Sequence, residues 1–198
     1  MTVKTALPML FIATLIIALE GCCLCPRRIK VVCVDFEPPL AVGTQYGSPG
    51  HNSGDLAFTT KGVPISVYEF KFNGDGAFRV ATIEEQPSLQ FSSGQCIRTN
   101  NINLEFDFSQ LGFQTSQVDL RFLDTGGHEN LSVNGSPIYV GELRSAPASI
   151  GGVSLVVNTE SFPPPSPNIR GILTLRGEVK TLRIGGQEFW IDQVCAKK

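Results

Sequence analysis

Apolar and polar residues alternate with a period of two along most of the chain after residue 30. The clearest segment is 102–108, in which four apolar residues alternate with Asn103, Glu105 and Asp107. This period is that of a β-strand with one face buried and the other in solvent. The other predicted strands span residues 32–36, 65–72, 78–83, 118–122, 131–133, 138–140, 153–157, 172–175, 179–184 and 188–194.

Turn signals separate these segments. Asn134-Gly135 tolerates positive φ at both positions and predicts a tight hairpin turn between 131–133 and 138–140. The proline-rich stretch 162–167 predicts a loop that crosses between sheets, because proline lacks the N–H donor that a ladder needs. Roughly ten short strands with regular turns, and no helical period after the first thirty residues, predict an all-β sandwich or barrel.

The start of the chain differs from this pattern. Lys4 is followed by the apolar run Ala6–Leu19, which is fourteen residues long. A transmembrane helix needs about 20 residues, so the run is typical of a signal peptide instead. We predict a signal peptide at 1–21, a linker near the membrane at 22–30 and one β-sandwich domain at 31–198. An uncleaved anchor is the alternative, although the basic residues that follow the run favour the opposite orientation for it.

The end of the apolar run, Leu19-Glu20-Gly21-Cys22, resembles a bacterial lipobox. Leu19, Gly21 and Cys22 match that pattern, whereas Glu20 departs from it. The resemblance implies that Cys22 is lipidated and anchors an exported protein to the membrane. Simple cleavage after Gly21 is the alternative, and it would give a secreted protein.

Six cysteines occur, at positions 22, 23, 25, 33, 96 and 195. Cys33 lies in the first predicted strand and Cys195 in the last. Because the terminal strands of sandwich folds are often neighbours, we predict a disulfide between Cys33 and Cys195. Cys96 is the alternative partner for either of them.

Composition and motifs limit the classes of function. Sixteen basic against eighteen acidic residues give a net charge of −2, which argues against non-specific nucleic-acid binding because that needs a positive field. The two histidines, His51 and His128, lie in turn-rich segments, and the sequence contains no nucleophile elbow, zinc-protease motif, P-loop or dinucleotide fingerprint. Glu84 and Glu85 are adjacent on a strand, so they point to opposite faces and make a poor glycosidase pair. We predict a non-enzymatic protein.

Two segments at opposite ends of the domain carry a family resemblance. Val34-Asp35-Phe36-Glu37 opens the first strand, and Phe189-Trp190-Ile191-Asp192-Gln193-Val194 closes the last. Together they resemble jelly-roll modules of the galactose-binding type, which include many carbohydrate-binding modules. The resemblance implies an antiparallel two-sheet jelly-roll sandwich of roughly ten strands. It also implies glycan binding and a structural Ca²⁺ held by Glu37 and Asp192.

The two carboxylates suit that ion, since Ca²⁺ takes oxygen ligands from carboxylates, carbonyls and water. If the terminal strands pair, Glu37 and Asp192 lie close together, and a cation would relieve their repulsion. The alternative is that each residue ends a strand and faces solvent. A second candidate cation loop contains Asp124 and Glu129 with the carbonyls between them.

Trp190 is the only tryptophan in the chain. Neighbours on a strand face opposite sides, so if Phe189 and Ile191 face the core, Trp190 lies on the other face and can stack on a sugar ring. The remaining predicted stacking residues are Tyr46, Tyr68 and Tyr139. The alternative for Trp190 is a second buried layer or a contact with a partner protein.

Taken together, these patterns predict an exported, non-enzymatic β-sandwich of the cell envelope that binds glycan. It is a membrane-anchored lipoprotein if Cys22 is modified and a secreted protein otherwise. The alternative function is a structural or adhesion protein that contacts other envelope proteins. Such a protein would present an exposed apolar patch or an unpaired sheet edge.

Overall fold

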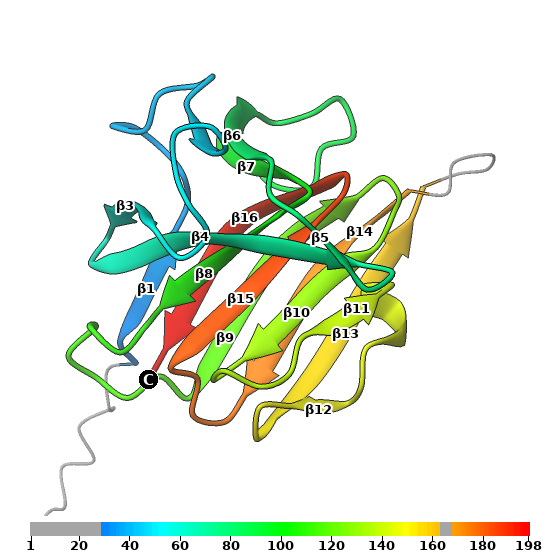
Figure 1. Cartoon of the computed structure of the whole chain (residues 1–198). Coiled ribbons are helices and arrows are strands. Elements are labelled where there is room, and N and C mark those ends of the chain that lie inside the picture. Colours follow the sequence, from blue (N-terminus) through cyan, green and yellow to red (C-terminus); the bar gives the residue numbers. More distant parts are fainter. Residues whose placement is uncertain (1–28, 163–167) are drawn as a thin grey trace, which may run out of the picture.

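The computed structural model describes residues 29–162 and 168–198, and within these ranges the chain is built from β-strands. Two antiparallel sheets pack face to face (Figure 1), which confirms the predicted all-β sandwich. The helical structure in the described residues is a single 3₁₀ turn, η1 (Leu143–Ser145). No helix in these same ranges is long and apolar enough to cross a membrane. The predicted signal peptide, most of the predicted linker and the prolines of 163–167 lie outside the described residues.

The larger sheet, called sheet A, has the strand order β12-β13-β14-β9-β16-β7-β6-β2, and β1 also pairs with β16. All its pairings are antiparallel. Its strands are β1 (Val31–Val34), β2 (Gln45–Gly47), β6 (Val80–Glu85), β7 (Gln95–Asn100), β9 (Gln117–Asp124), β12 (Ser149–Ile150), β13 (Val153–Ser161), β14 (Ile169–Arg176) and β16 (Phe189–Lys197).

The second sheet, sheet B, has the order β11-β10-β15-β8-β4-β3, and β5 pairs with β4. Its strands are β3 (Leu56–Thr60), β4 (Val63–Phe72), β5 (Asp75–Ala77), β8 (Ile102–Asp107), β10 (Glu129–Val133), β11 (Tyr139–Gly141) and β15 (Thr181–Gly186). The end of β4 leaves the ladder with β8 after Glu69 and crosses sheet B toward β5, as Figure 1 shows.

The described residues form sixteen strands, so the predicted number of roughly ten was wrong. Five strands, namely β2, β3, β5, β7 and β12, have no counterpart among the predicted segments. Four of them are only two to five residues long, which is too short for alternation to be recognised. The fifth, β7, has the sequence Gln-Cys-Ile-Arg-Thr-Asn, in which polar residues interrupt the alternation of apolar and polar positions.

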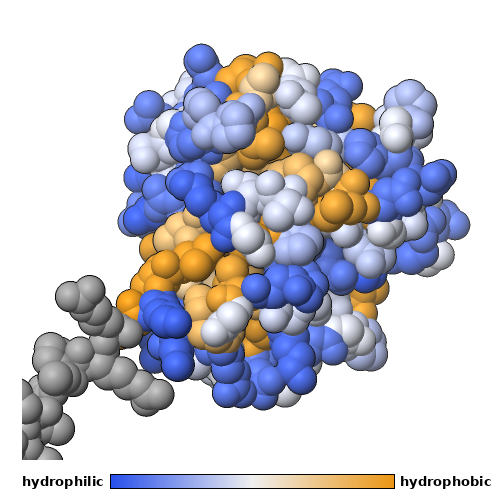
Figure 2. Space-filling model, turned by 90° about the vertical axis from the view of Figure 1, so that its left-hand side faces the viewer, coloured by the Kyte–Doolittle hydropathy of each residue, from blue (hydrophilic) through white to orange (hydrophobic). Residues whose placement is uncertain are grey.

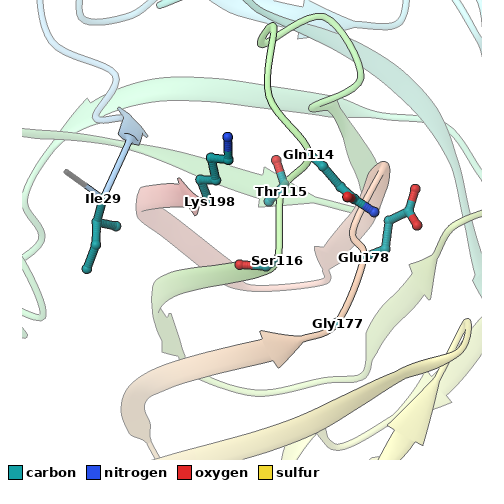
Figure 3. Close-up of a pocket in the computed structure, with 7 residues that line it drawn as sticks. All are labelled: Ile29, Gln114, Thr115, Ser116, Gly177, Glu178 and Lys198. Atoms are coloured by element: carbon teal, nitrogen blue, oxygen red, sulfur yellow. The ribbon is translucent and has the colours of Figure 1, made fainter. Parts of the chain in front are cut away.

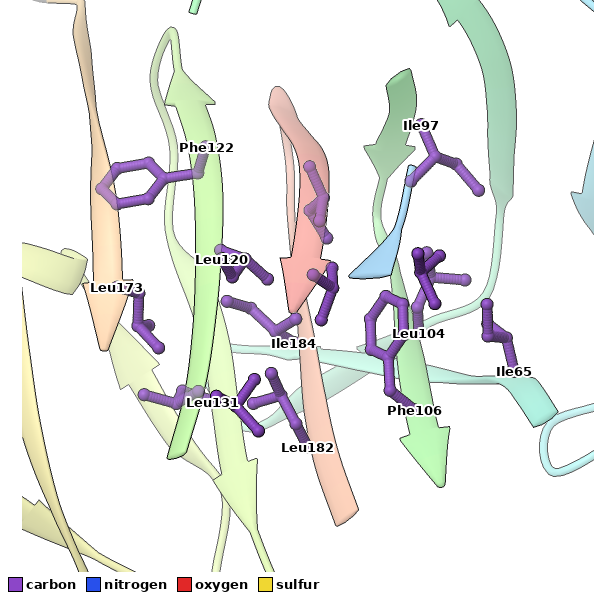
Figure 4. Packing of buried hydrophobic residues seen from close by; sticks show 14 of the residues in the cluster. Ile65, Ile97, Leu104, Phe106, Leu120, Phe122, Leu131, Leu173, Leu182 and Ile184 are labelled. Atoms are coloured by element: carbon purple, nitrogen blue, oxygen red, sulfur yellow. The ribbon is translucent and has the colours of Figure 1, made fainter. Parts of the chain in front are cut away.

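Inward-facing apolar residues of both sheets form one main core. Figure 4 shows Leu120 and Phe122 of sheet A in the same space as Leu104, Leu131 and Ile184 of sheet B. All five are completely buried. Burial of each such side chain contributes about 1.5–3 kcal/mol, so this interior is the main source of stability.

The two ends of the domain meet in sheet A. Strand β16 pairs with β9 on both sides of a bulge, while its other edge pairs first with β7 and then with β1. Cys33 and Cys195 are opposite each other in the β1–β16 register, and their sulfur atoms lie 2.11 Å apart, at disulfide-bonding distance. This agrees with the predicted pairing.

A bulge in β16 changes which side chains face the core. Gln193 has a φ of 48°, and the register with β9 shifts between Asp192 and Cys195. Ile191 and Val194 therefore both belong to the main core although they are three residues apart. The bulge is what turns Cys195 outward toward Cys33.

Candidate functional site

A polar groove of about 770 Å³ lies on the outer face of sheet A, which is the face turned away from sheet B. Residues from β13, β14, β9 and β16 form its floor, and the 86–94 loop between β6 and β7 forms a wall. The polar side chains that line it include Gln90, Arg121, Asn158, Glu160, Arg170 and Gln193.

The floor of the groove is a row of residues in register. Asn158 of β13 is opposite Ile172 of β14, and Ile172 is opposite Arg121 of β9. Arg121 lies between Leu120 and Phe122, which are in the core, so alternation directs the arginine outward. Its Nε donates a 2.9 Å hydrogen bond to Oε1 of Gln193, the bulged residue of β16.

Arg170 ties the wall of the groove to its floor. Its Nη1 donates a 2.6 Å hydrogen bond to the backbone oxygen of Gln90 in the loop. Its Nε donates a 3.1 Å hydrogen bond to Oε2 of Glu160 on the neighbouring strand β13. The guanidinium also lies 5.2 Å from the centre of the Phe162 ring. The loop is therefore held over the sheet by contacts that the sequence spacing does not reveal.

Trp190 lies on the outer face of sheet A, opposite Phe189 and Ile191, but the 86–94 loop covers it. It is 9% exposed and packs in a small cluster with Phe91, Cys96 and Leu123. The indole Nε1 donates a 2.9 Å hydrogen bond to Oε2 of Glu84. The ring is thus part of a second buried layer and does not offer an open face for a sugar.

Cys96, in the same cluster, is a free and fully buried thiol. Burial raises its pKa to about 12, and the negative charges of Asp192 and Glu84 add to the rise. Among the described cysteines it is the one without a disulfide, and it lies too deep to behave as a reactive thiolate.

The three predicted stacking tyrosines lie on different parts of the molecule. Tyr46 of β2 is 8% exposed and packs against Phe58, with ring centres 4.5 Å apart. Tyr68 of β4 carries the guanidinium of Arg183 over its ring at 3.5 Å. Tyr139 of β11 donates its hydroxyl to the backbone oxygen of Glu142. The fold does not bring them together with Trp190 into one aromatic surface.

Glu37 and Asp192, the carboxylates assigned to calcium by resemblance, lie near each other at the joined terminal strands. Oε1 of Glu37 accepts a 2.9 Å hydrogen bond from the backbone N–H of Gln95. Asp192 is completely buried and accepts a 2.7 Å hydrogen bond from the N–H of Gln193. The pKa of Asp192 is raised to about 7, chiefly by burial and in part by the charge of Glu37.

A different group of carboxylates meets at one end of the sandwich. One oxygen from each of Asp124, Glu129 and Glu142 lies within 4.8 Å of the others. Asp124 ends β9 of sheet A, Glu129 begins β10 of sheet B, and Glu142 follows β11. The sequence placed Asp124 and Glu129 in one loop but gave no sign of Glu142, which arrives through a separate hairpin.

Burial dominates the chemistry of this acidic cluster. It raises the pKa of Glu129 to about 8, and the nearby charge of Asp124 adds to that rise. Burial also raises the pKa of Asp124, while the backbone N–H of Gly126 lowers it by donating a hydrogen bond. A carboxyl group in this place is either protonated or, if it is ionised, needs a cation beside it.

Another hollow, of about 580 Å³, lies where the described chain begins and ends (Figure 3). Figure 3 shows Lys198 between Ile29 and Thr115, with Glu178 on the far side. Ile29 is the first described residue, so this hollow borders a part of the chain that the structure does not describe. We assign it no function. Cys22, the predicted lipidation site, also lies outside the described residues.

Comparison of the chain with protein-family models, curated proteins and solved structures found no significant match. The residues that the sequence analysis missed, Arg121, Asn158 and Arg170, occupy outward positions of strands whose inward residues form the core. Alternation could have indicated their face, but not that the register of three strands brings Asn158 and Arg121 into one row, with Arg170 beside it.

Proposed function

We propose that this protein is a non-enzymatic glycan-binding β-sandwich and that the polar groove on sheet A holds the ligand. The observation that carries this proposal is the row Asn158, Ile172 and Arg121 beneath the loop wall. The groove volume of about 770 Å³ is within the usual range for small-ligand sites.

The chemistry of the lining supports a hydroxyl-rich ligand. Asn158 and Gln193 each offer an amide donor and an amide acceptor, and Arg121 offers a fork of donors. A sugar hydroxyl both donates and accepts, so such mixed planar groups satisfy it well. Ile172 gives the floor an apolar strip against which the C–H face of a sugar ring can pack.

We further propose that the protein acts outside the cytoplasm. The apolar run Ala6–Leu19 and the Cys22 motif support export, with a lipid anchor if Cys22 is modified. The disulfide-bonded pair Cys33 and Cys195 supports an oxidising compartment. The intact mass of the protein isolated from its membrane or medium tests this, since it reports cleavage after Gly21 and any lipid on Cys22.

Glycan binding is tested with a glycan array and calorimetry on the full chain and two double variants. Asn158→Ala with Arg121→Ala removes two polar ends of the row and should weaken binding by more than about tenfold. Ser154→Ala with Arg176→Ala is the matched control, because these residues are paired on β13 and β14 and share the same face of the sheet. Equal binding by both double variants, or no glycan retained by the parent, would refute the proposal.

A second function is favoured by the edge of sheet B. Strand β3 is the last strand of that sheet, and Leu56 on it is 57% exposed. Figure 2 views the side of the molecule where β3 and β1 lie, and apolar residues gather on it. We propose, as the alternative, that an envelope protein adds a strand to this edge.

A photo-crosslinker at position 56 tests the alternative in intact cells. It should link to one defined protein, identified by mass spectrometry, whereas a crosslinker at Val140 should not. Val140 is a suitable control because it is also exposed and lies on β11, the opposite edge strand of sheet B. The same background of products from both positions would remove the alternative.

A further inference from the structure

The acidic cluster occupies a junction between the two sheets. On β9, Asp124 is an even number of positions from Leu120 and Phe122, so it is on the same face of the strand. On β10, Glu129 shares a face with Leu131 and Val133 for the same reason. These apolar residues all face the interior, so both carboxylates are directed between the sheets where β9 and β10 meet. Glu142 closes this end from the segment that joins β11 to η1.

The spacing of the three carboxylates fits a shared cation. Their oxygens lie within 4.8 Å of one another, and two ligands on opposite sides of a Ca²⁺ ion are separated by about 4.6–5.2 Å. Arg144 is the nearby basic group, with Nη2 3.6 Å from Oε2 of Glu142. Three carboxylates and one guanidinium give a formal charge of −2 when all are ionised, which a divalent cation balances.

The buried side chain of Glu129 gives a second reason to expect a ligand in the acidic cluster. Its side chain is completely buried, and Oε2 accepts a 3.1 Å hydrogen bond from the N–H of Leu143. Its other oxygen, Oε1, is buried, and no described N–H or hydroxyl group donates a hydrogen bond to it. A buried oxygen without a donor carries a free-energy cost, which is larger when the group is charged. A ligand that contacts Oε1 removes that cost.

We propose that Asp124, Glu129 and Glu142 bind a divalent cation of the hard, oxygen-seeking class, with Ca²⁺ as the best match. Water completes the coordination shell on the side of Glu142, which is only half-buried. The bound ion joins the end of β9, the start of β10 and the segment after β11. This site is distinct from the polar groove and does not depend on the proposed glycan function.

The test is calorimetric titration of the full chain with CaCl₂ after treatment with EDTA, together with thermal denaturation. We expect one bound Ca²⁺ per chain and a higher melting temperature in excess Ca²⁺, because the ion binds the folded state. Glu129→Gln should weaken binding by more than about tenfold, since it removes a charged ligand. Glu142→Gln should also weaken it, and its half-buried position keeps that variant folded.

Two controls separate this site from other carboxylates. Glu178→Gln changes an exposed glutamate that lines the other hollow and should bind Ca²⁺ as the parent does. Asp192→Asn should also retain binding, because Asp192 belongs to the pair with Glu37. The proposal is overturned if the parent binds no Ca²⁺, if both glutamine variants at 129 and 142 bind as tightly as the parent, or if only Asp192→Asn abolishes binding.

Discussion

Asn103 donates its side-chain amide to Oδ1 of Asn130 across the glycine that separates their strands, with a nitrogen-to-oxygen distance of 3.0 Å. In the register of sheet B, Gly185 of β15 is opposite Asn103 on one side and Asn130 on the other. Asn130 also bonds to both backbone groups of Lys71, and Asn103 donates to the backbone oxygen of Glu69. These two asparagines therefore fasten the crossing end of β4 to sheet B.

Replacing Asn130 should destabilise the fold strongly. Asn130→Ala leaves the N–H and C=O of Lys71 without their partners, and the free energy of unfolding should fall by about 2–4 kcal/mol. Chemical denaturation followed by circular dichroism measures this. Asn158→Ala, at an exposed asparagine, should change it by less than about 0.5 kcal/mol. Equal effects of the two variants would contradict the role given to Asn130.

Gly185 should resist substitution for a steric reason. A Cβ atom at this position would lie 2.1 Å from the backbone oxygen of Ile102 and 2.7 Å from Oδ1 of Asn103. Gly185→Ala should therefore cost about 1–3 kcal/mol. Ser154→Ala is the control, because it changes an exposed strand residue without crowding. Gly135→Ser would not serve, because Gly135 has a positive φ. A Gly185→Ala protein as stable as the parent would show that β15 can move away.

Trp190 should act as a packing residue and a reporter of unfolding. Trp190→Ala should lower the free energy of unfolding by about 3–5 kcal/mol, because it empties the small cluster under the loop. Trp190→Phe keeps much of the packing but removes the donor to Glu84, so its cost should be about 1–2 kcal/mol. The emission of this single tryptophan should shift to the red when the parent unfolds. An unchanged stability of Trp190→Ala would indicate an exposed ring instead.

The bridge between Cys33 and Cys195 should contribute substantially to stability. The two residues are 162 positions apart in sequence, so the bond restricts a long loop in the unfolded chain. Cys33→Ser with Cys195→Ser should lower the free energy of unfolding by about 4–5 kcal/mol on the chain-entropy model. Denaturation of the double variant and of the parent, both without reductant, provides the comparison. Identical midpoints would show that the bridge does not form in solution.

Asp192 should make stability depend on pH. Its pKa is raised to about 7 in the folded protein by burial, against about 3.9 for an aspartate in an unfolded chain. Between these values the folded state binds more protons than the unfolded state, so stability falls as pH rises. Its contribution is complete below about pH 4 and is lost as pH rises through about 7.

The variant Asp192→Asn isolates this effect. Between about pH 5 and pH 8 the parent should lose on the order of 2 kcal/mol more stability than the variant does. The comparison uses chemical denaturation in EDTA, so that no cation competes with the proton. Asp75→Asn, at an exposed carboxylate, serves as control and should follow the parent. Parallel pH profiles of the parent and Asp192→Asn would disprove the assignment.

Some features followed directly from the sequence because they depend on neighbours along the chain. Alternation in 102–108 predicted a strand with Leu104 and Phe106 inward, and both are buried in the core. The same rule expected Asn103 on the solvent side. It faces away from the core but is completely buried, because β4 crosses over it. Alternation gives the face of the sheet on which a side chain lies, whereas another strand, here β4, decides whether that face is exposed to solvent.

The residues of the candidate site were harder to predict from alternation along the chain. Outward positions such as Arg121 and Asn158 could be identified one strand at a time, but their alignment depends on the register of β13, β14 and β9. Glu142 is 13 positions from Glu129 and 18 from Asp124, and no local pattern links the three. Trp190 was placed on the correct face, yet the 86–94 loop that covers it could not be inferred from its own strand.

The sequence by itself determined the class of the fold and the direction of most side chains, and it favoured a bridge between Cys33 and Cys195, with Cys96 as the alternative partner. The fold class and the side-chain directions arise from a two-residue period, which is a local property of the chain. Only the tertiary structure decided which polar residues lie together. The results are the groove around Arg121, the hydrogen bonds between Asn130 and the backbone of Lys71, and the acidic cluster at Glu129. Each depends on segments far apart in sequence that the packing of two sheets brings together, and alternation carries no information about such distances.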